Sequence, residues 1–162
     1  YTLPAAPDGE ILEARPATAP LLAALAERAV EAPLAALFID YGHAKSGIGD
    51  TLQAMHRHHY ADPLASPGET DLTAHVDFAA LKHEAEALGL RAYGPMPQGE
   101  FLLRLGLSER RDRLLEAARP EQRELISSGA ARLADPSQMG ILFKVLALTS
   151  DGLAPPPPFG DI

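Results

Sequence analysis

The clearest feature in the pattern of hydrophobic and polar residues is an apolar run over residues 34–39, which stops at Asp40, Tyr41 and Gly42. An uninterrupted apolar run of this length predicts a strand that is buried on both faces, as in a parallel sheet covered by helices. Ligands of open α/β sheets bind beyond the carboxyl ends of the strands. We therefore expect Asp40 and Tyr41 at a ligand-binding edge, with Gly42 allowing the chain to turn away sharply.

The remaining pattern predicts helices and strands in alternation. Helical spacing of apolar residues is found over residues 16–30, 77–89, 98–105, 109–118 and 121–133. Strands are predicted over residues 10–13, 34–40, 90–96 and 143–149. Residues 41–76 show no sustained period and predict a long functional loop, with at most a short strand near 51–55. This order predicts an α/β fold with a parallel sheet, whose last strand is free to run antiparallel because several helices precede it.

Composition narrows the possible classes of protein. The 162 residues suit one domain, and the net charge of −8 argues against a nucleic-acid surface, which needs clustered Lys and Arg. No apolar run approaches the roughly 20 residues of a membrane helix. The absence of Cys excludes disulfides, thiolate nucleophiles and Cys-based metal sites, and it fits a cytoplasmic protein of a bacterium.

Short motifs then point to a known family. They are Asp40-Tyr-Gly42, Gly49-Asp-Thr-Leu52 with His58, Pro67-Gly68, Asp71-Leu-Thr-Ala-His-Val-Asp77-Phe78, Gln98 with Phe101-Leu102, Gly106, Met139-Gly140 and Phe143-Lys-Val-Leu146. In this order, over roughly residues 10–149, they resemble the C-terminal part of the MidA-like (DUF185) family of S-adenosylmethionine-dependent methyltransferases. Its eukaryotic members include the mitochondrial complex I assembly arginine methyltransferase.

The resemblance implies a class I, Rossmann-like methyltransferase fold, which has a seven-stranded sheet with an antiparallel last strand. Residues 1–150 would be the C-terminal part of that domain, with a helical insertion at about 97–135 and a Pro-rich tail at 151–162. We expect the tail to be extended and frayed. The family's glycine-rich cofactor loop is missing, because residues 42–49 follow the wrong strand. Most of the S-adenosylmethionine site is therefore expected before Tyr1, and this chain alone is not expected to be active.

The function implied by the resemblance is methyl transfer from S-adenosylmethionine to an arginine of a partner protein. Carboxylates are the natural clamps for a guanidinium, so Glu13 and Asp40 are the candidate catalytic residues. The candidate substrate-binding residues are Tyr41, Gly42, His58, Asp71, Thr73, His75, Asp77 and Gln98. Structural roles compete with these assignments: Glu13, Asp77 and Gln98 could each cap a helix instead.

Other functions remain open at this stage. The protein could be a non-catalytic assembly factor or binding module, or it could methylate a small molecule. His56, His58 and His59 with Asp62 invite a metal site, but their spacing lacks the usual helical pair of ligands, so no metal is expected. A protein substrate is the expected partner, nucleic acid and membrane are not expected, and a homodimer is an open option.

Overall fold

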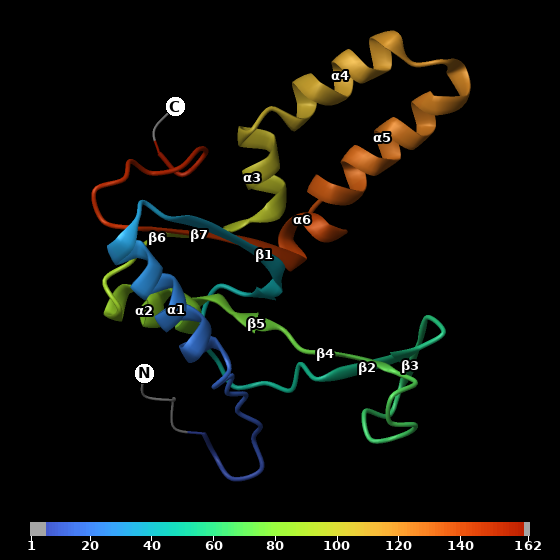
Figure 1. Cartoon of the computed structure of the whole chain (residues 1–162). Coiled ribbons are helices and arrows are strands. Elements are labelled where there is room, and N and C mark those ends of the chain that lie inside the picture. The colour runs from blue at the N-terminus through green and yellow to red at the C-terminus, as the bar shows by residue number, and fades with distance from the viewer. Residues whose placement is uncertain (1–5, 161–162) are drawn as a thin grey trace.

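The computed structural model describes residues 6–160 and centres on a four-stranded sheet (Figure 1). The strands are β1 (Ala35–His43), β5 (Val76–Asp77), β6 (Arg91–Pro97) and β7 (Phe143–Thr149), in the order β5-β1-β7-β6. β5 runs parallel to β1, whereas β7 runs antiparallel to both β1 and β6. The predicted α/β class and the antiparallel last strand are confirmed.

Two helices cover one face of this sheet, α1 (Thr18–Glu31) and α2 (Phe78–Ala87) (Figure 1). Their buried side chains meet those of β7 in one hydrophobic core, which consists of Leu22, Phe78, Leu81, Ala85, Leu90, Leu146 and Leu148. Asp77 caps α2, since its carboxylate accepts a hydrogen bond of 2.9 Å from the amide of Ala80. Gly89 ends the helix at φ 86°, a conformation that favours glycine.

A helical insertion separates β6 from β7, as the sequence predicts. It consists of α3 (Gln98–Arg104), α4 (Leu107–Ala117), α5 (Pro120–Ala134) and a short α6 (Met139–Leu142) that was not predicted. α4 and α5 form a hairpin that extends away from the sheet (Figure 1). No helix within residues 6–160 is long and apolar enough to cross a membrane.

The predicted long loop of residues 41–76 contains a second sheet. Its strands are β2 (Gln53–His56), β3 (His59–Ala61) and β4 (Asp71–Thr73), in the order β3-β2-β4. Arg57 and His58 form the two-residue turn between β2 and β3, with φ values of 50° and 66°. Such a turn usually contains Asn or Gly, so this sequence carries no hairpin signal.

Two predicted segments differ in the structure. Residues 10–13 form no strand, and the segment is attached to the loop after β1 by a hydrogen bond from the amide of Gly49 to the carbonyl of Ile11 (2.9 Å). The tail was predicted to fray, but residues 158–160 are packed, while residues 161 and 162 lie outside the described residues. Pro158 is fully buried, and the ring of Phe159 lies 5.7 Å from that of Phe101. Burial of these apolar side chains offsets the loss of chain entropy.

Candidate functional site

A cavity of about 1000 Å³ lies beyond the carboxyl end of β1. Its walls come from residues 12–18, the loop that follows β1, residues 74–77 between the end of β4 and the start of α2, and the first turns of α2. The lining carries charges of both signs, from the carboxylates of Glu13, Asp77 and Glu84 and the cations of Arg15 and Lys45, and it also includes the imidazole of His43. A concave site with several convergent polar groups is the usual form of a ligand-binding site.

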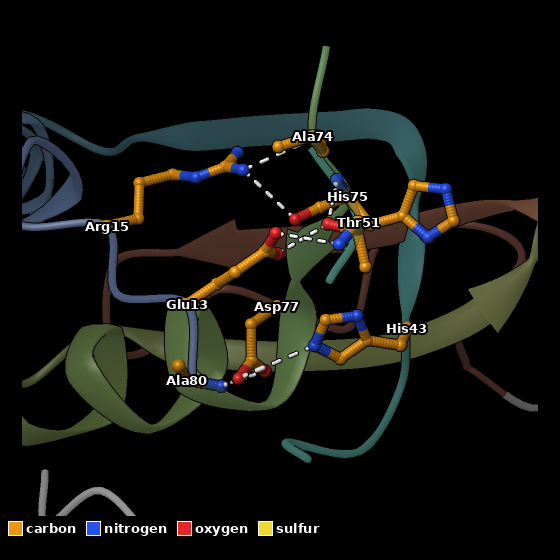
Figure 2. Close-up of polar contacts among 8 residues, drawn as sticks. All are labelled: Glu13, Arg15, His43, Thr51, Ala74, His75, Asp77 and Ala80. Atoms are coloured by element: carbon orange, nitrogen blue, oxygen red, sulfur yellow. Dashed lines mark hydrogen bonds and ion pairs between the residues drawn. The ribbon is translucent and has the colours of Figure 1, made fainter. Parts of the chain in front are cut away.

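Glu13 binds the loop that forms one wall of this cavity (Figure 2). The amide of Thr51 donates to one carboxylate oxygen of Glu13 at 2.8 Å, and the Thr51 hydroxyl donates to the other. The same hydroxyl accepts a hydrogen bond of 2.9 Å from the amide of His75. Three segments that are distant in the sequence are thereby joined at a single threonine.

Arg15 strengthens this junction from the same segment as Glu13. Its guanidinium donates to the carbonyl of His75 at 3.0 Å and to that of Ala74 at 3.4 Å (Figure 2). Burial alone would raise the pKa of Glu13, but the hydrogen bonds from Thr51 and the Leu52 amide, together with the Arg15 charge, outweigh it and lower that pKa. Glu13 is therefore held as a carboxylate.

His43 and Asp77 form a second polar pair in the cavity wall (Figure 2). They lie opposite each other in the register of β1 and β5, with Nε2 of His43 3.7 Å from Oδ2 of Asp77. Gly42 makes this pairing possible. A Cβ at residue 42 would lie 2.2 Å from the carbonyl oxygen of Val76, so only glycine lets β5 approach β1 this closely.

The structure brings some of the predicted residues together. Glu13, His75 and Asp77 line the cavity, and Gly42 lies against Val76 next to them. Tyr41 packs edge to face against His75 and Phe143, at ring distances of 5.7 and 5.5 Å. The prediction that Gly42 lets the chain turn away is wrong, since β1 continues to His43. Glycine is needed at residue 42 because β5 approaches β1 closely there.

Other predicted residues do not line this cavity. Asp40 is exposed, accepts a hydrogen bond from the amide of Tyr41 (2.8 Å) and lies opposite Lys144 of β7. His58 forms the turn of the β2–β3 hairpin, and Asp71 and Thr73 belong to β4. Gln98 is buried at the start of the insertion and donates to the carbonyl of Leu133 at 2.9 Å.

Several lining residues were missed from the sequence. They are Arg15, His43, Lys45, Thr51 and Glu84. The position of His43, directly after the Asp-Tyr-Gly strand end, was a sequence signal for a place in the site. Glu84 had no such signal, because it reaches the cavity only through the packing of α2 beside α1. Within residues 6–160, no three His, Cys, Asp or Glu side chains gather as metal ligands would.

Comparison with known proteins adds independent information. Residues 2–96 match a family model described as "Putative S-adenosyl-L-methionine-dependent methyltransferase". The chain is 45% identical over 131 residues to the mitochondrial protein arginine methyltransferase NDUFAF7 homolog of Drosophila melanogaster, covering 80% of this chain and 30% of that protein. It is 36% identical over 115 residues to the human mitochondrial protein arginine methyltransferase NDUFAF7, covering 70% of this chain and 26% of that protein.

Solved structures agree with these relatives. A COG1565-superfamily protein from Burkholderia thailandensis, bound to S-adenosyl-homocysteine, matches 79% of this chain and 35% of its own length, with 30% identity and a TM-score of 0.62. The chain thus spans about a third of the length of the proteins it matches. The prediction of a bacterial cytoplasmic protein is wrong, because the matched curated relatives are mitochondrial proteins of eukaryotes.

Proposed function

Since the chain belongs to this family of S-adenosyl-L-methionine-dependent methyltransferases, we propose that the protein transfers a methyl group from S-adenosylmethionine to an arginine of a partner protein. In this proposal the chain supplies the acceptor side of the site. The observation that supports it is the cavity at the end of β1, with the carboxylates of Glu13, Asp77 and Glu84 in its wall. Carboxylates balance the charge of a guanidinium and match its planar donor geometry.

The proposed roles differ among these residues. Asp77 and Glu84 face the acceptor and attract its positive charge, while Glu13 adds charge and holds the loop at Thr51 in place. His75 lines the cavity, and Tyr41, which does not line it, supports the His75 ring by an edge contact. Asp40, His58, Asp71, Thr73 and Gln98 are left out of the proposed acceptor site, because none of them lines the cavity.

The described residues lack a recognisable loop for the methyl donor. Gly42 lies near the end of β1 and Gly47 and Gly49 follow it, but they lack the spacing of a glycine-rich loop that would bind such a donor. Residues 6–160 thus give no glycine-rich donor loop, and we propose that residues outside this chain bind most of S-adenosylmethionine. The chain's own part is to bind and orient the acceptor in the cavity.

The test uses the protein produced from its complete open reading frame. We expect calorimetric titration to detect S-adenosylmethionine binding, and we expect radiolabelled donor to methylate protein in a mitochondrial extract, with methylarginine recovered after hydrolysis. Absence of donor binding would exclude the enzyme function. Label found only in small molecules, or on a residue other than arginine, would contradict the proposed acceptor.

A protein-binding role without catalysis is the second candidate. The observation in its favour is the α4–α5 hairpin, in which no residue is fully buried and which extends from the sheet (Figure 1). A helical pair with so much free surface suits contact with another protein. This role alone would apply if the complete protein bound a partner but neither bound nor consumed S-adenosylmethionine.

A further inference from the structure

We propose that His43 is a catalytic residue that accepts the proton released by the acceptor nitrogen, and that Asp77 positions its imidazole. This inference rests on the proposed methyl transfer and assigns the proton's destination in the same cavity. The sequence motifs gave no role to His43. Its role is inferred from the register of two strands and from a pair of side chains in the cavity wall.

The backbone places the pair with little freedom. Parallel pairing sets His43 of β1 opposite Asp77 of β5, and Gly42 permits the close approach. One carboxylate oxygen of Asp77 is fixed by the amide of Ala80 at the start of α2, at 2.9 Å. The other oxygen lies 3.7 Å from Nε2 of His43 (Figure 2). The imidazole therefore lies beside a carboxylate that is itself held by a helix.

This arrangement leaves the second ring nitrogen available. A carboxylate beside Nε2 favours the tautomer that carries its proton on Nε2, which leaves a lone pair on Nδ1. Nδ1 makes no hydrogen bond within residues 6–160, and the His43 side chain is 34% exposed in the cavity wall. Nδ1 can thus receive a proton from a bound acceptor.

The other polar groups in the cavity are poorer proton acceptors. Glu13 is bound by Thr51, and Glu84 accepts a hydrogen bond of 3.1 Å from the hydroxyl of Thr18. Arg15 and Lys45 have cationic side chains, which donate hydrogen bonds and have no lone pair to accept a proton. His75 also lines the cavity, but its ring packs edge to face against Tyr41 at 5.7 Å. Of these two lining histidines, His43 is the one that the structure pairs with a carboxylate, which leaves Nδ1 as its accepting nitrogen.

The step balances in atoms and charge. A guanidinium nitrogen forms a bond with the methyl carbon of the sulfonium donor, the carbon–sulfur bond breaks, and its electron pair stays on sulfur as a thioether. The proton on that nitrogen passes to Nδ1 of His43. The acceptor remains a guanidinium with one added methyl group, and the resulting imidazolium faces the Asp77 carboxylate until it releases the proton to water.

The test compares His43→Gln with His59→Gln, a matched variant on β3 of the second sheet, in the complete protein. Initial rates are measured at saturating radiolabelled S-adenosylmethionine, with mitochondrial extract as the acceptor and the pH varied. We expect His43→Gln to lower the rate about 100-fold, at the low end of general-base effects. His43→Gln should also remove the fall in rate at acidic pH, while calorimetry should show an unchanged affinity for the donor. His59→Gln should keep the rate and the pH profile of the wild type.

Two further measurements complete the test. In Asp77→Asn the side chain can still cap α2, so we expect the same melting temperature as wild type and a lower rate. We expect ¹⁵N spectra of the imidazoles to show His43 with its proton on Nε2 in the wild type, and we expect that preference to be lost in Asp77→Asn. These spectra test the inference even if His43→Gln fails to fold. An active wild type with an unchanged His43→Gln rate and pH profile would overturn this inference alone. An inactive wild type would overturn the methyl transfer on which it rests.

Discussion

Glu13 and Thr51, 38 residues apart in the sequence, are joined by hydrogen bonds from both the amide and the hydroxyl of the threonine. The threonine hydroxyl also accepts from the amide of His75, so one carboxylate organises two separate walls of the cavity. A carboxylate engaged in this way has less capacity to clamp a substrate. Its main effect is therefore to fix the shape in which an acceptor is received.

Replacing Glu13 by Gln should loosen the loop that carries Thr51. The amide side chain can accept through one atom only, so one of the two donors of Thr51 loses its partner. We expect faster amide hydrogen exchange over residues 47–52, corresponding to a loss of about 1–2 kcal/mol of local stability. Mass spectrometry of peptic peptides from the complete protein measures this.

Glu10→Gln is the matched control for this loosening. Glu10 lies in the same segment and is exposed, so its substitution changes the net charge equally without touching Thr51. Equal exchange over residues 47–52 in both variants would show that charge, and not the bond to Thr51, stabilises the loop.

The contribution of Glu13 should depend on pH in a defined direction. The pKa of Glu13 is lowered from its ordinary value of 4.5, because the hydrogen bonds and the Arg15 charge outweigh the opposing effect of burial. A lowered folded-state pKa means that the stabilisation is present above pH 4.5 and is lost as the pH falls through the folded-state value. We expect wild type to unfold with a larger free energy than Glu13→Gln at pH 7.

Urea unfolding of both proteins from pH 7 down to pH 3 measures that difference. The pKa of Asp135 is also lowered, by hydrogen bonds from Ser137, but its effect is common to both proteins and cancels. A difference that stayed constant or grew toward pH 3 would contradict the ionised, hydrogen-bonded state of Glu13.

Gly42→Ala tests the close approach of β5 to β1. The added Cβ would meet the carbonyl oxygen of Val76 at 2.2 Å, and a backbone atom cannot move aside without shifting β5. We expect a loss of about 2 kcal/mol in the free energy of unfolding, as for other overpacked sites, together with separation of His43 from Asp77. Thermal melting and the histidine spectra follow these two effects.

Gly129→Ala provides the contrast for Gly42→Ala. Gly129 lies within α5 and has no atom within 4 Å of its Cβ position, so alanine should stabilise the helix by about 0.5–1 kcal/mol. If both substitutions changed stability in the same direction, steric contact would not be the reason why residue 42 is glycine.

The main elements of the fold could be predicted because each has a local sequence signal, such as an apolar run or a capping residue. The apolar run 143–149 became β7 with the same bounds, and Asp77 capped α2 as its residue type suggests. Of the second sheet, only β2 was anticipated, as a short strand near residues 51–55. The other two strands are short, and the tight turn between β2 and β3 is formed by Arg57 and His58 without glycine. Residues 10–13 were predicted to form a strand because Ile11 and Leu12 are apolar. The sequence pattern does not contain the hydrogen bonds from Thr51 to Glu13 and from Gly49 to Ile11 that hold this segment instead.

The candidate site was less predictable, since it depends on which segments meet. The cavity does lie at the sheet edge that the Asp-Tyr-Gly strand end indicated, but the exposed Asp40 lies outside it, whereas His43, three residues later, lines it. His43 gains its partner from strand register, and Thr51 gains three hydrogen bonds from Glu13 and His75. Single-residue patterns contain neither relationship, because both require long-range packing.

Phe159→Ala tests whether the C-terminal tail stabilises the insertion. The ring of Phe159 lies 5.7 Å from that of Phe101 in α3 and 6.5 Å from that of Tyr93 in β6, so it links the insertion to the sheet. Because Phe159 is only half-buried, we expect a loss of about 2 kcal/mol, less than the roughly 3–5 kcal/mol of a fully buried phenylalanine. Leu153→Ala removes an exposed apolar side chain from the same tail and should cost much less. Urea unfolding distinguishes the two, and equal losses would mean that the tail contributes through general hydrophobicity and not through the ring contacts of Phe159.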